Sequence, residues 1–209
     1  MAWRIGGSPE VRFNRGKPFY VHVVNYIAQA HGFVDLASRG LANLYTTMGE
    51  AEREAAFADP VYGATARRIF EGRLTEQLAR LAIEAKAQTP PIVLDLGLLG
   101  EELVDHHDEI LEGIMGHAGA LFMLAWETSE SFHNPGPLWE FLRHCRNAAA
   151  HGGRFNFVRA EPRRPAQWGT FTITAALQAT PLFESRGSAG LLKPADGLLL
   201  LFDIEQTIP

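Results

Sequence analysis

The residues with the clearest chemical potential lie near the end of the segment 138–153. Arg146 and Asn147 are adjacent there, and His151 follows four residues after Asn147. A guanidinium can stabilise charge on a phosphoryl group, and an imidazole can exchange protons with attacking and leaving oxygens. The three alanines at 148–150 leave space beside these groups for a ligand or another helix. Arg146 and His151 are therefore candidates for chemistry on a phosphodiester.

Helical spacing separates these polar side chains from an apolar face of the same segment. One face carries Leu138, Leu142, Cys145 and Ala149, which we expect to be buried. Another face carries Arg143, Asn147 and His151. Arg146 lies about 140° around the helix from His151, so the two can meet only in a wide groove or where the last turn unwinds. Pro137 predicts the start of this helix, and the glycines at 152–153 predict its end.

The same region is the most basic part of an acidic chain. Residues 143–164 contain six arginines and one glutamate, whereas the net charge of the whole chain is −5. An arginine fork fits phosphate oxygens, so Arg143 and Arg154 are candidate phosphate contacts flanking the catalytic candidates. A role in surface solubility is the alternative for these two residues. The overall charge disfavours indiscriminate binding to nucleic acid.

The run Arg146-Asn147-Ala148-Ala149-Ala150-His151 resembles the motif of HEPN domains, in which an arginine and a polar residue precede three residues and a histidine. The flanks are similar as well, because aromatic residues begin the helix at 139–141 and two glycines follow the histidine. The resemblance covers residues 18–153 as a helical bundle, and its specific part is residues 138–155.

The resemblance implies a homodimer in which the motif helices of two protomers face each other across a cleft. Active HEPN proteins are metal-independent endoribonucleases that use the 2′-hydroxyl of RNA as the nucleophile. By this resemblance Arg146 would orient or stabilise the scissile phosphate, His151 would be the general acid and base, and Asn147 would orient one of them. RNA would be the substrate in a toxin or phage-defence role, with a possible cognate antitoxin. The alternative is a non-catalytic HEPN-like module that binds RNA, a nucleotide or a partner protein.

The hydrophobic pattern predicts a mainly α fold, a bundle of four to five helices with a small C-terminal β-hairpin or sheet. The expected helices are residues 18–39 or 18–45, 51–58, 67–88, 104–132 and 138–151, with residues 92–100 as a connector. Strict alternation predicts a strand at 170–174, and we interpret the apolar run 198–202 as another strand. The expected domains are an irregular N-terminal arm (1–17), an HEPN-like bundle (18–153) and a β-rich extension packed on it (154–209).

Three glycines at 113, 116 and 119 track roughly one side of the expected helix 104–132. Each of them costs about 1 kcal/mol relative to alanine in a helix interior. Small residues permit another helix to come close, so this spacing predicts a close helix–helix contact.

The amino-acid composition indicates the cellular compartment and excludes some kinds of metal site. The single cysteine, Cys145, excludes a disulfide scaffold and a cysteine-based zinc cluster. The N-terminus lacks an apolar signal core, and the longest nearly uncharged run, 113–126, is shorter than a membrane span. We therefore expect a cytoplasmic protein without a membrane partner, and we expect no metal and no cofactor. The segment Asp105–Glu109 leaves a metal hydrolase as an alternative, although its composition is typical of a solvated first helical turn.

Overall fold

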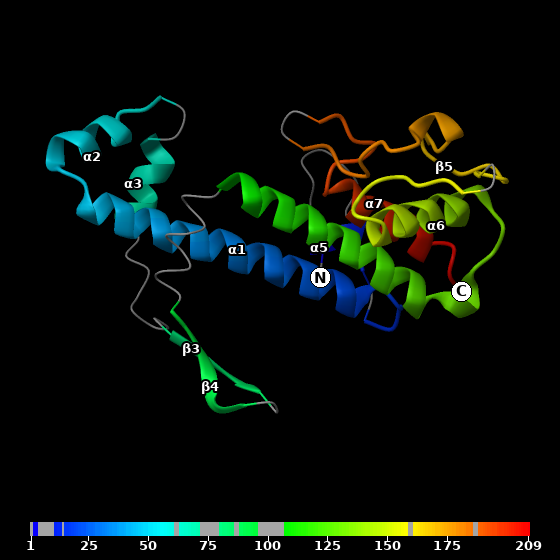
Figure 1. Cartoon of the computed structure of the whole chain (residues 1–209), viewed down its shortest axis with the longest axis horizontal. Helices are drawn as coiled ribbons and strands as arrows, with labels where there is room; N and C mark the ends of the chain where they lie inside the picture. The colour runs from blue at the N-terminus through cyan, green and yellow to red at the C-terminus, as the bar shows by residue number, and fades with distance from the viewer. Residues whose placement is uncertain are drawn as a thin grey trace. The chain divides into compact units, whose positions relative to one another are not determined.

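The structure is a computed structural model that describes residues 2–3, 11–13, 15–60, 63–71, 80–85, 88–95, 107–158, 161–185 and 188–209 (Figure 1). These residues form a mainly helical fold with a small two-stranded antiparallel sheet near the C-terminus, which confirms the expected fold class. The chain divides into two compact units, residues 1–28 with 111–209 and residues 29–110. No helix in the described ranges is both long enough and apolar enough to cross a membrane.

The first unit is built on α5 (His107–Thr128) from residue 111 onward, α6 (Pro137–Ala150) and α7 (Asp196–Glu205), together with the start of α1 (Tyr20–Thr47). The short 3₁₀ helix η1 (Glu130–Phe132) lies between α5 and α6. The largest fully buried apolar side chains come from α5, α6 and α7, from the residue before α1, and from the described residues between α6 and α7: Phe19, Phe122, Phe141, Leu142, Phe155, Ile173, Leu182, Leu192, Leu200, Leu201 and Ile204. The helices expected from residue 18 and over 138–151 are confirmed, and most of the helix expected over 104–132 is α5.

Helices α5 and α6 lie side by side in opposite directions (Figure 1). A Cβ atom added to Gly119 on α5 would lie 3.2 Å from the Cβ atom of Ala149 on α6. Gly119 therefore permits the close contact that the glycine spacing predicts. A Cβ atom on Gly116 would meet no atom within 4 Å, so this glycine is not explained by the same contact.

The C-terminal part of the first unit has little regular strand. Strands β5 (Gln167–Trp168) and β6 (Phe171–Thr172) pair antiparallel, and the Ile173 amide continues the pairing by donating to the Ala166 carbonyl over 2.9 Å. The strand expected at 170–174 is thus present in a shorter form. The 3₁₀ helix η2 (Ala175–Leu177) follows, and an isolated parallel bridge joins Phe183 to Leu192.

The prediction of a strand at 198–202 is wrong, because these residues belong to α7. A continuous apolar run fits a buried helix as well as a buried strand. Here Asp196 begins the helix, and its carboxylate accepts a hydrogen bond of 2.7 Å from the Lys193 amide. Leu200, Leu201 and Ile204 are then fully buried, so packing of the helix in the core decides its structure.

The second unit contains the rest of α1, then α2 (Glu50–Phe57) and α3 (Gly63–Glu71). The short helix expected at 51–58 is therefore confirmed. The rings of Tyr45 and Phe57 lie 5.7 Å apart, and those of Phe57 and Phe70 lie 5.6 Å apart. The Arg53 guanidinium lies over Phe70, and the Arg67 guanidinium lies over Phe57. Aromatic packing thus joins all three helices within this unit.

The prediction of a helix over 67–88 is wrong for the described residues beyond α3. The prediction of a connector from residue 92 is wrong as well, because these residues begin within a strand. Strands β3 (Arg80–Ala85) and β4 (Gln88–Asp95) form an antiparallel hairpin, while residues 72–79 and 96–100 lie outside the described residues. Leu81 pairs with Leu94, and Ile83 pairs with Ile92. The alternation of Leu81, Ile83 and Ala85 fits a strand face, and the β-branched pair Ile92 and Val93 favours a strand as well.

The N-terminal arm contributes a short pair of strands to the first unit. Strand β1 (Ala2–Trp3) pairs antiparallel with β2 (Val11–Arg12). The next residue, Phe13, is buried with its ring edge-on to Phe202 at 6.0 Å. The Lys17 ammonium donates to the backbone carbonyl of Ile208 over 2.6 Å. These contacts fix part of the arm against the C-terminal residues.

Candidate functional site

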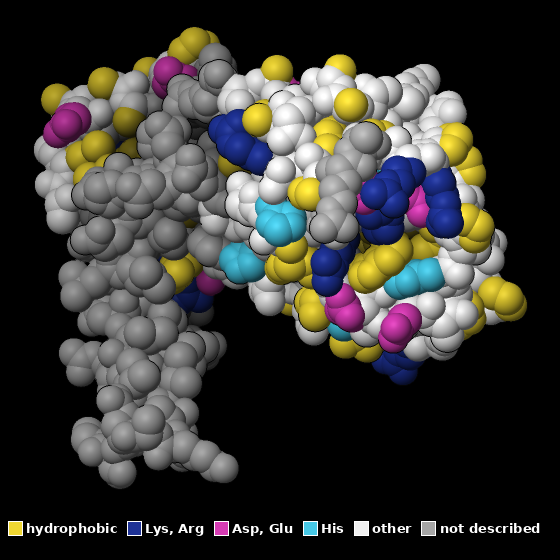
Figure 2. All heavy atoms as spheres, turned by 45° about the vertical axis from the view of Figure 1, so that its right-hand side comes forward, with side chains coloured by type: hydrophobic (Ala, Val, Ile, Leu, Met, Phe, Trp, Pro, Cys, Tyr) yellow, Lys and Arg dark blue, Asp and Glu magenta, His cyan; other side chains and the backbone are white. Residues whose placement is uncertain are grey.

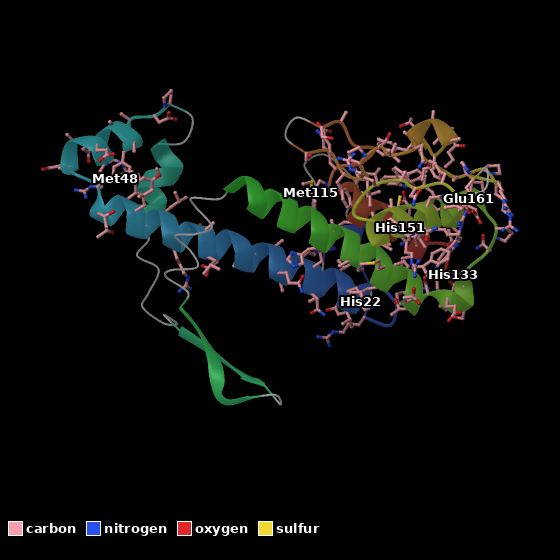
Figure 3. The ribbon with its side chains drawn as sticks, in the orientation of Figure 1. His22, Met48, Met115, His133, His151 and Glu161 are labelled. Carbon is pink, nitrogen blue, oxygen red and sulfur yellow. The ribbon has the colours of Figure 1, made fainter. Side chains whose placement is uncertain are left out.

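His151 lies at the C-terminal end of α6, as its position before two glycines predicts. Its backbone amide donates to the carbonyls of Asn147 and Ala148 over 3.1 Å, which closes the helix. Gly152 and Gly153 then adopt φ values of +72° and +73°, a conformation that favours glycine. The side chain of His151 is exposed, and its imidazole has no hydrogen-bonding partner among the described residues. It is thus free to reach a ligand in solvent (Figure 3).

Arg146 points toward α5 and is held there by two contacts. One of its terminal nitrogens (Nη2) lies 2.9 Å from a carboxylate oxygen of Glu127, and the other (Nη1) donates to the side-chain carbonyl of Asn147 over 3.3 Å. Its Nε is buried without a hydrogen-bonding partner among the described residues. The side chain keeps 34% of its surface exposed. The guanidinium is therefore positioned by its neighbours and still accessible.

Within one protomer, side-chain hydrogen bonds connect only two of the three catalytic candidates. Asn147 contacts Arg146, so the adjacent pair acts as one positioned group. In the described part of the chain, no hydrogen bond links the side chain of His151 to the side chain of Arg146 or Asn147. Glu127 was missed by sequence reasoning, because the residue lies 19 positions before Arg146 and no local spacing connects them. Only the antiparallel packing of α5 on α6 brings the carboxylate to the guanidinium.

Arg143 lies within a partly buried ion network rather than free on the surface. Its Nε lies 3.0 Å from Glu140, and its Nη1 lies 3.3 Å from Glu161. Glu140 is only 6% exposed and also receives a contact of 3.4 Å from Arg164. Two carboxylates therefore compensate the charge of Arg143. This placement explains the residue as part of the contact between α6 and the segment around residue 161.

His144 completes this network as a neutral imidazole. It is 2% exposed, and its Nε2 lies 3.0 Å from Nη2 of Arg143. Because a guanidinium only donates, His144 must accept at Nε2 and carry its proton on Nδ1. Burial, followed by the nearby Arg143 charge, lowers the pKa of His144 below its ordinary value, although Glu161 and Glu140 oppose this shift. The imidazole is thus held neutral by its surroundings.

We expect the free energy of unfolding to decrease as the pH falls below about 6.5, partly because of His144. The unfolded chain binds a proton at this histidine near that pH, whereas the lowered pKa delays protonation of the folded chain. Stability is therefore fully present above pH 6.5 and is lost as the pH approaches the folded pKa. Urea unfolding of His144→Gln between pH 5 and pH 8 should show a shallower decrease, by at most about 1.4 kcal/mol per pH unit.

The matched control for this prediction is His31→Gln, because His31 is exposed on α1. It makes the same substitution at an exposed position, so a difference in slope between the two variants reports on the burial of His144. His133, whose pKa burial also lowers, is present in both variants and contributes equally to their curves. Equal slopes for His144→Gln and the unmodified chain would contradict the prediction.

Arg154 contrasts with Arg143, because its charge is not compensated by a carboxylate among the described residues. Its Nη1 donates to the backbone carbonyl of Ala179 over 3.0 Å, and the residue is exposed. Figure 2 shows Lys and Arg side chains beside Asp and Glu on one face of the molecule, so the surface drawn there is of mixed charge. Arg154 thus remains a candidate anion contact.

Two further expectations concern cysteine and metal. Cys145 is fully buried, as its position on the apolar face predicts, and burial raises the pKa of its thiol. Among the described residues no group of three or more His, Cys, Asp or Glu side chains could hold a metal ion. Asp105 and His106, which begin the acidic and histidine-rich segment, lie outside the described residues.

No family model, no curated protein and no solved structure matches this chain.

Proposed function

We propose that the chain is a metal-independent endoribonuclease of the HEPN type, acting in the cytoplasm as a homodimer in a toxin or defence role. The observation that carries this proposal is the end of α6, where the exposed His151 imidazole follows a positioned Arg146–Asn147 pair. This arrangement offers an acid–base group and a cation without metal ligands. The resemblance to the HEPN motif supplies the reaction class.

In the proposed reaction His151 takes the proton of the RNA 2′-hydroxyl. The 2′-oxygen then attacks the adjacent phosphorus, and the bond from phosphorus to the 5′-oxygen breaks. The proton returns to the leaving 5′-oxygen, so that the products carry a 2′,3′-cyclic phosphate and a 5′-hydroxyl. Arg146 stabilises the charge on the phosphoryl oxygens, and Asn147 orients the guanidinium through its side-chain carbonyl.

The proposal is tested by incubating purified protein with RNA in the presence and absence of EDTA. We expect cleavage that EDTA does not reduce, with cyclic phosphate or 3′-phosphate ends on the products. Size-exclusion chromatography with light scattering measures the oligomeric state in parallel, and we expect a dimer. Cleavage abolished by EDTA would overturn the proposed mechanism.

We expect Glu127→Gln to bind RNA more tightly than the unmodified protein. The Glu127 carboxylate, 2.9 Å from Arg146, competes with a phosphate for the same guanidinium. The pair is partly exposed, with 34% of the Arg146 surface and 63% of the Glu127 surface accessible, so its net contribution is small. Removing the charge should lower the Kd for RNA by up to about fivefold, measured by fluorescence anisotropy at constant salt.

The matched control is Asp35→Asn, which removes the carboxylate that pairs with Arg39 over 2.9 Å on α1. It makes the same change in net charge outside the proposed site. Equal gains in both variants would mean that only the overall charge matters. A weaker affinity in Glu127→Gln would show that the carboxylate positions Arg146 for the RNA rather than competing with it.

The alternative is a non-catalytic HEPN-like module that binds RNA, a nucleotide or a partner protein. The ion pair of Glu127 with Arg146 favours this alternative, because it partly neutralises the cation that catalysis requires. Binding without cleavage that persists in both Arg146→Ala and His151→Ala would support the module over the enzyme.

A further inference from the structure

A cavity of about 420 Å³ opens beside the end of α6, within the first unit. Its walls come from α5 at residues 115, 116 and 119, from Ala149 on α6, from the turn at 152–154, and from residues 181–183, 185 and 188. Figure 3 labels Met115 on α5 and His151 beside α6. His151 itself does not line the cavity. The volume falls within the range of about 300–1,000 Å³ that is common for pockets that bind small molecules.

Gly116 keeps one wall of this cavity open. Glycine in a helix interior costs about 1 kcal/mol relative to alanine. For Gly119 the contact with Ala149 explains that cost, but a Cβ atom on Gly116 would extend into open space. The missing side chain at residue 116 therefore serves no packing contact among the described residues. It does leave room in the cavity that this residue lines.

The polar groups of the cavity favour an anion. Arg154 lines it, donates one hydrogen bond to a backbone carbonyl, and has no carboxylate partner among the described residues. The described lining includes no acidic residue. Ser185 and Ser188 also line the cavity, and their side-chain hydroxyls have no hydrogen-bonding partner among the described residues. A guanidinium and two hydroxyls can together bind phosphate oxygens.

The rest of the cavity lining favours a ligand that is larger than an inorganic ion. Met115 and Ala149, both half-buried, supply an apolar wall, and the largely buried Phe183 ring, which also lines the cavity, is fixed by stacking on Phe122 at 5.7 Å. A free phosphate would leave this wall and much of the volume unoccupied. A ligand with an apolar body and one anionic group fills both parts of the cavity.

We infer that this cavity binds a phosphorylated small molecule of the size of a nucleoside monophosphate, with its phosphate on Arg154. Ser185 and Ser188 then donate to the phosphate or to hydroxyls of the ligand, and the apolar wall contacts its organic body. This site is separate from the His151 imidazole, so the inference does not depend on RNA cleavage. The same phosphate chemistry could come from a nucleotide within RNA, and the test distinguishes the two sources.

Isothermal titration calorimetry tests the inference with adenosine 5′-monophosphate, adenosine, inorganic phosphate and a short single-stranded RNA as probes. We expect the monophosphate to bind about tenfold or more tightly than adenosine or phosphate alone, because only it contacts both parts of the cavity. Arg154→Met should weaken its binding by a similar factor. Arg15→Met, at an exposed arginine of the same unit, is the control and should leave binding unchanged.

A second variant, Gly116→Leu, fills the cavity without removing any charge. We expect it to abolish binding of the monophosphate, while its urea unfolding midpoint is at least that of the unmodified protein, because leucine is the better helix former. Monophosphate binding that survives Gly116→Leu or Arg154→Met would overturn the inference. So would the absence of monophosphate binding at millimolar concentration, or binding of the RNA alone.

Discussion

His151→Ala is expected to reduce RNA cleavage by about 100-fold to 10,000-fold, the range that a positioned acid–base group contributes. In the proposed reaction this imidazole both takes the proton of the 2′-hydroxyl and returns one to the leaving oxygen. The side chain is exposed and forms no hydrogen bond with the described residues, so its removal leaves the packing of α6 intact. The loss should therefore lie in kcat, with RNA affinity and unfolding midpoint close to those of the unmodified protein.

The matched control is His31→Ala, which removes another exposed histidine from a helix. It should cleave RNA at the rate of the unmodified protein. A second comparison separates catalysis from binding, because Arg146→Ala should weaken RNA binding as well as cleavage. Equal cleavage by His151→Ala and the unmodified protein would remove His151 from the mechanism and leave any nuclease activity to another site or a contaminant.

The parts of the fold that the sequence predicts well have local causes. Pro137 begins α6 and two glycines with positive φ follow its end, so both boundaries could be predicted to within one residue. The hairpin at residues 80–95 and helix α7 could not be predicted from the sequence, and the reason differs between the two. Around β3 the apolar residues fit both helical and strand spacings, so the pattern alone does not separate the predicted helix from the strand that forms. At α7 a run of leucines has no period, and burial on α5 and α6 decides its structure.

In the candidate site, too, the sequence predicts the local contacts but not the distant ones. Adjacent residues in one helix predict that Arg146 and Asn147 lie together and that His151 ends the helix. The partners that decide the state of each arginine come from distant segments. Glu127 reaches Arg146 from α5, and Glu161 reaches Arg143 from 18 positions further along the chain. No spacing rule in a single sequence connects these pairs.

The cavity is harder to predict than the candidate site, because its walls come from segments that lie far apart in the sequence. Glycines spaced three apart on α5 predict a close helix contact, and Gly119 provides it. The same pattern gives no indication that Gly116 lines a cavity, because other parts of the lining come from residues 181–183, 185 and 188, far away in the sequence. Arg154 was a candidate phosphate contact from its charge alone. The structure adds the surroundings that make a small phosphorylated ligand a specific expectation for it.

We expect Glu140→Ala to lower the free energy of unfolding by about 2–3 kcal/mol. Removing one partner of a buried ion pair typically costs about 3–5 kcal/mol, because it leaves the other charge uncompensated. The value here is smaller, since Arg143 remains 26% exposed and keeps its contact of 3.3 Å with Glu161. Urea unfolding at pH 7.5, where His144 is neutral in both the folded and unfolded chain, measures the difference without a contribution from that histidine.

Arg164→Ala provides the control, because it removes the other cation that contacts Glu140. Arg164 is 60% exposed at a distance of 3.4 Å, so its loss should cost less than about 1 kcal/mol. The double variant Glu140→Ala/Arg143→Ala should be more stable than the sum of the single effects predicts, since neither charge then remains unpaired. Additive losses would show that the two residues do not form a coupled pair, and Arg143 would again be available as a phosphate contact beside the motif.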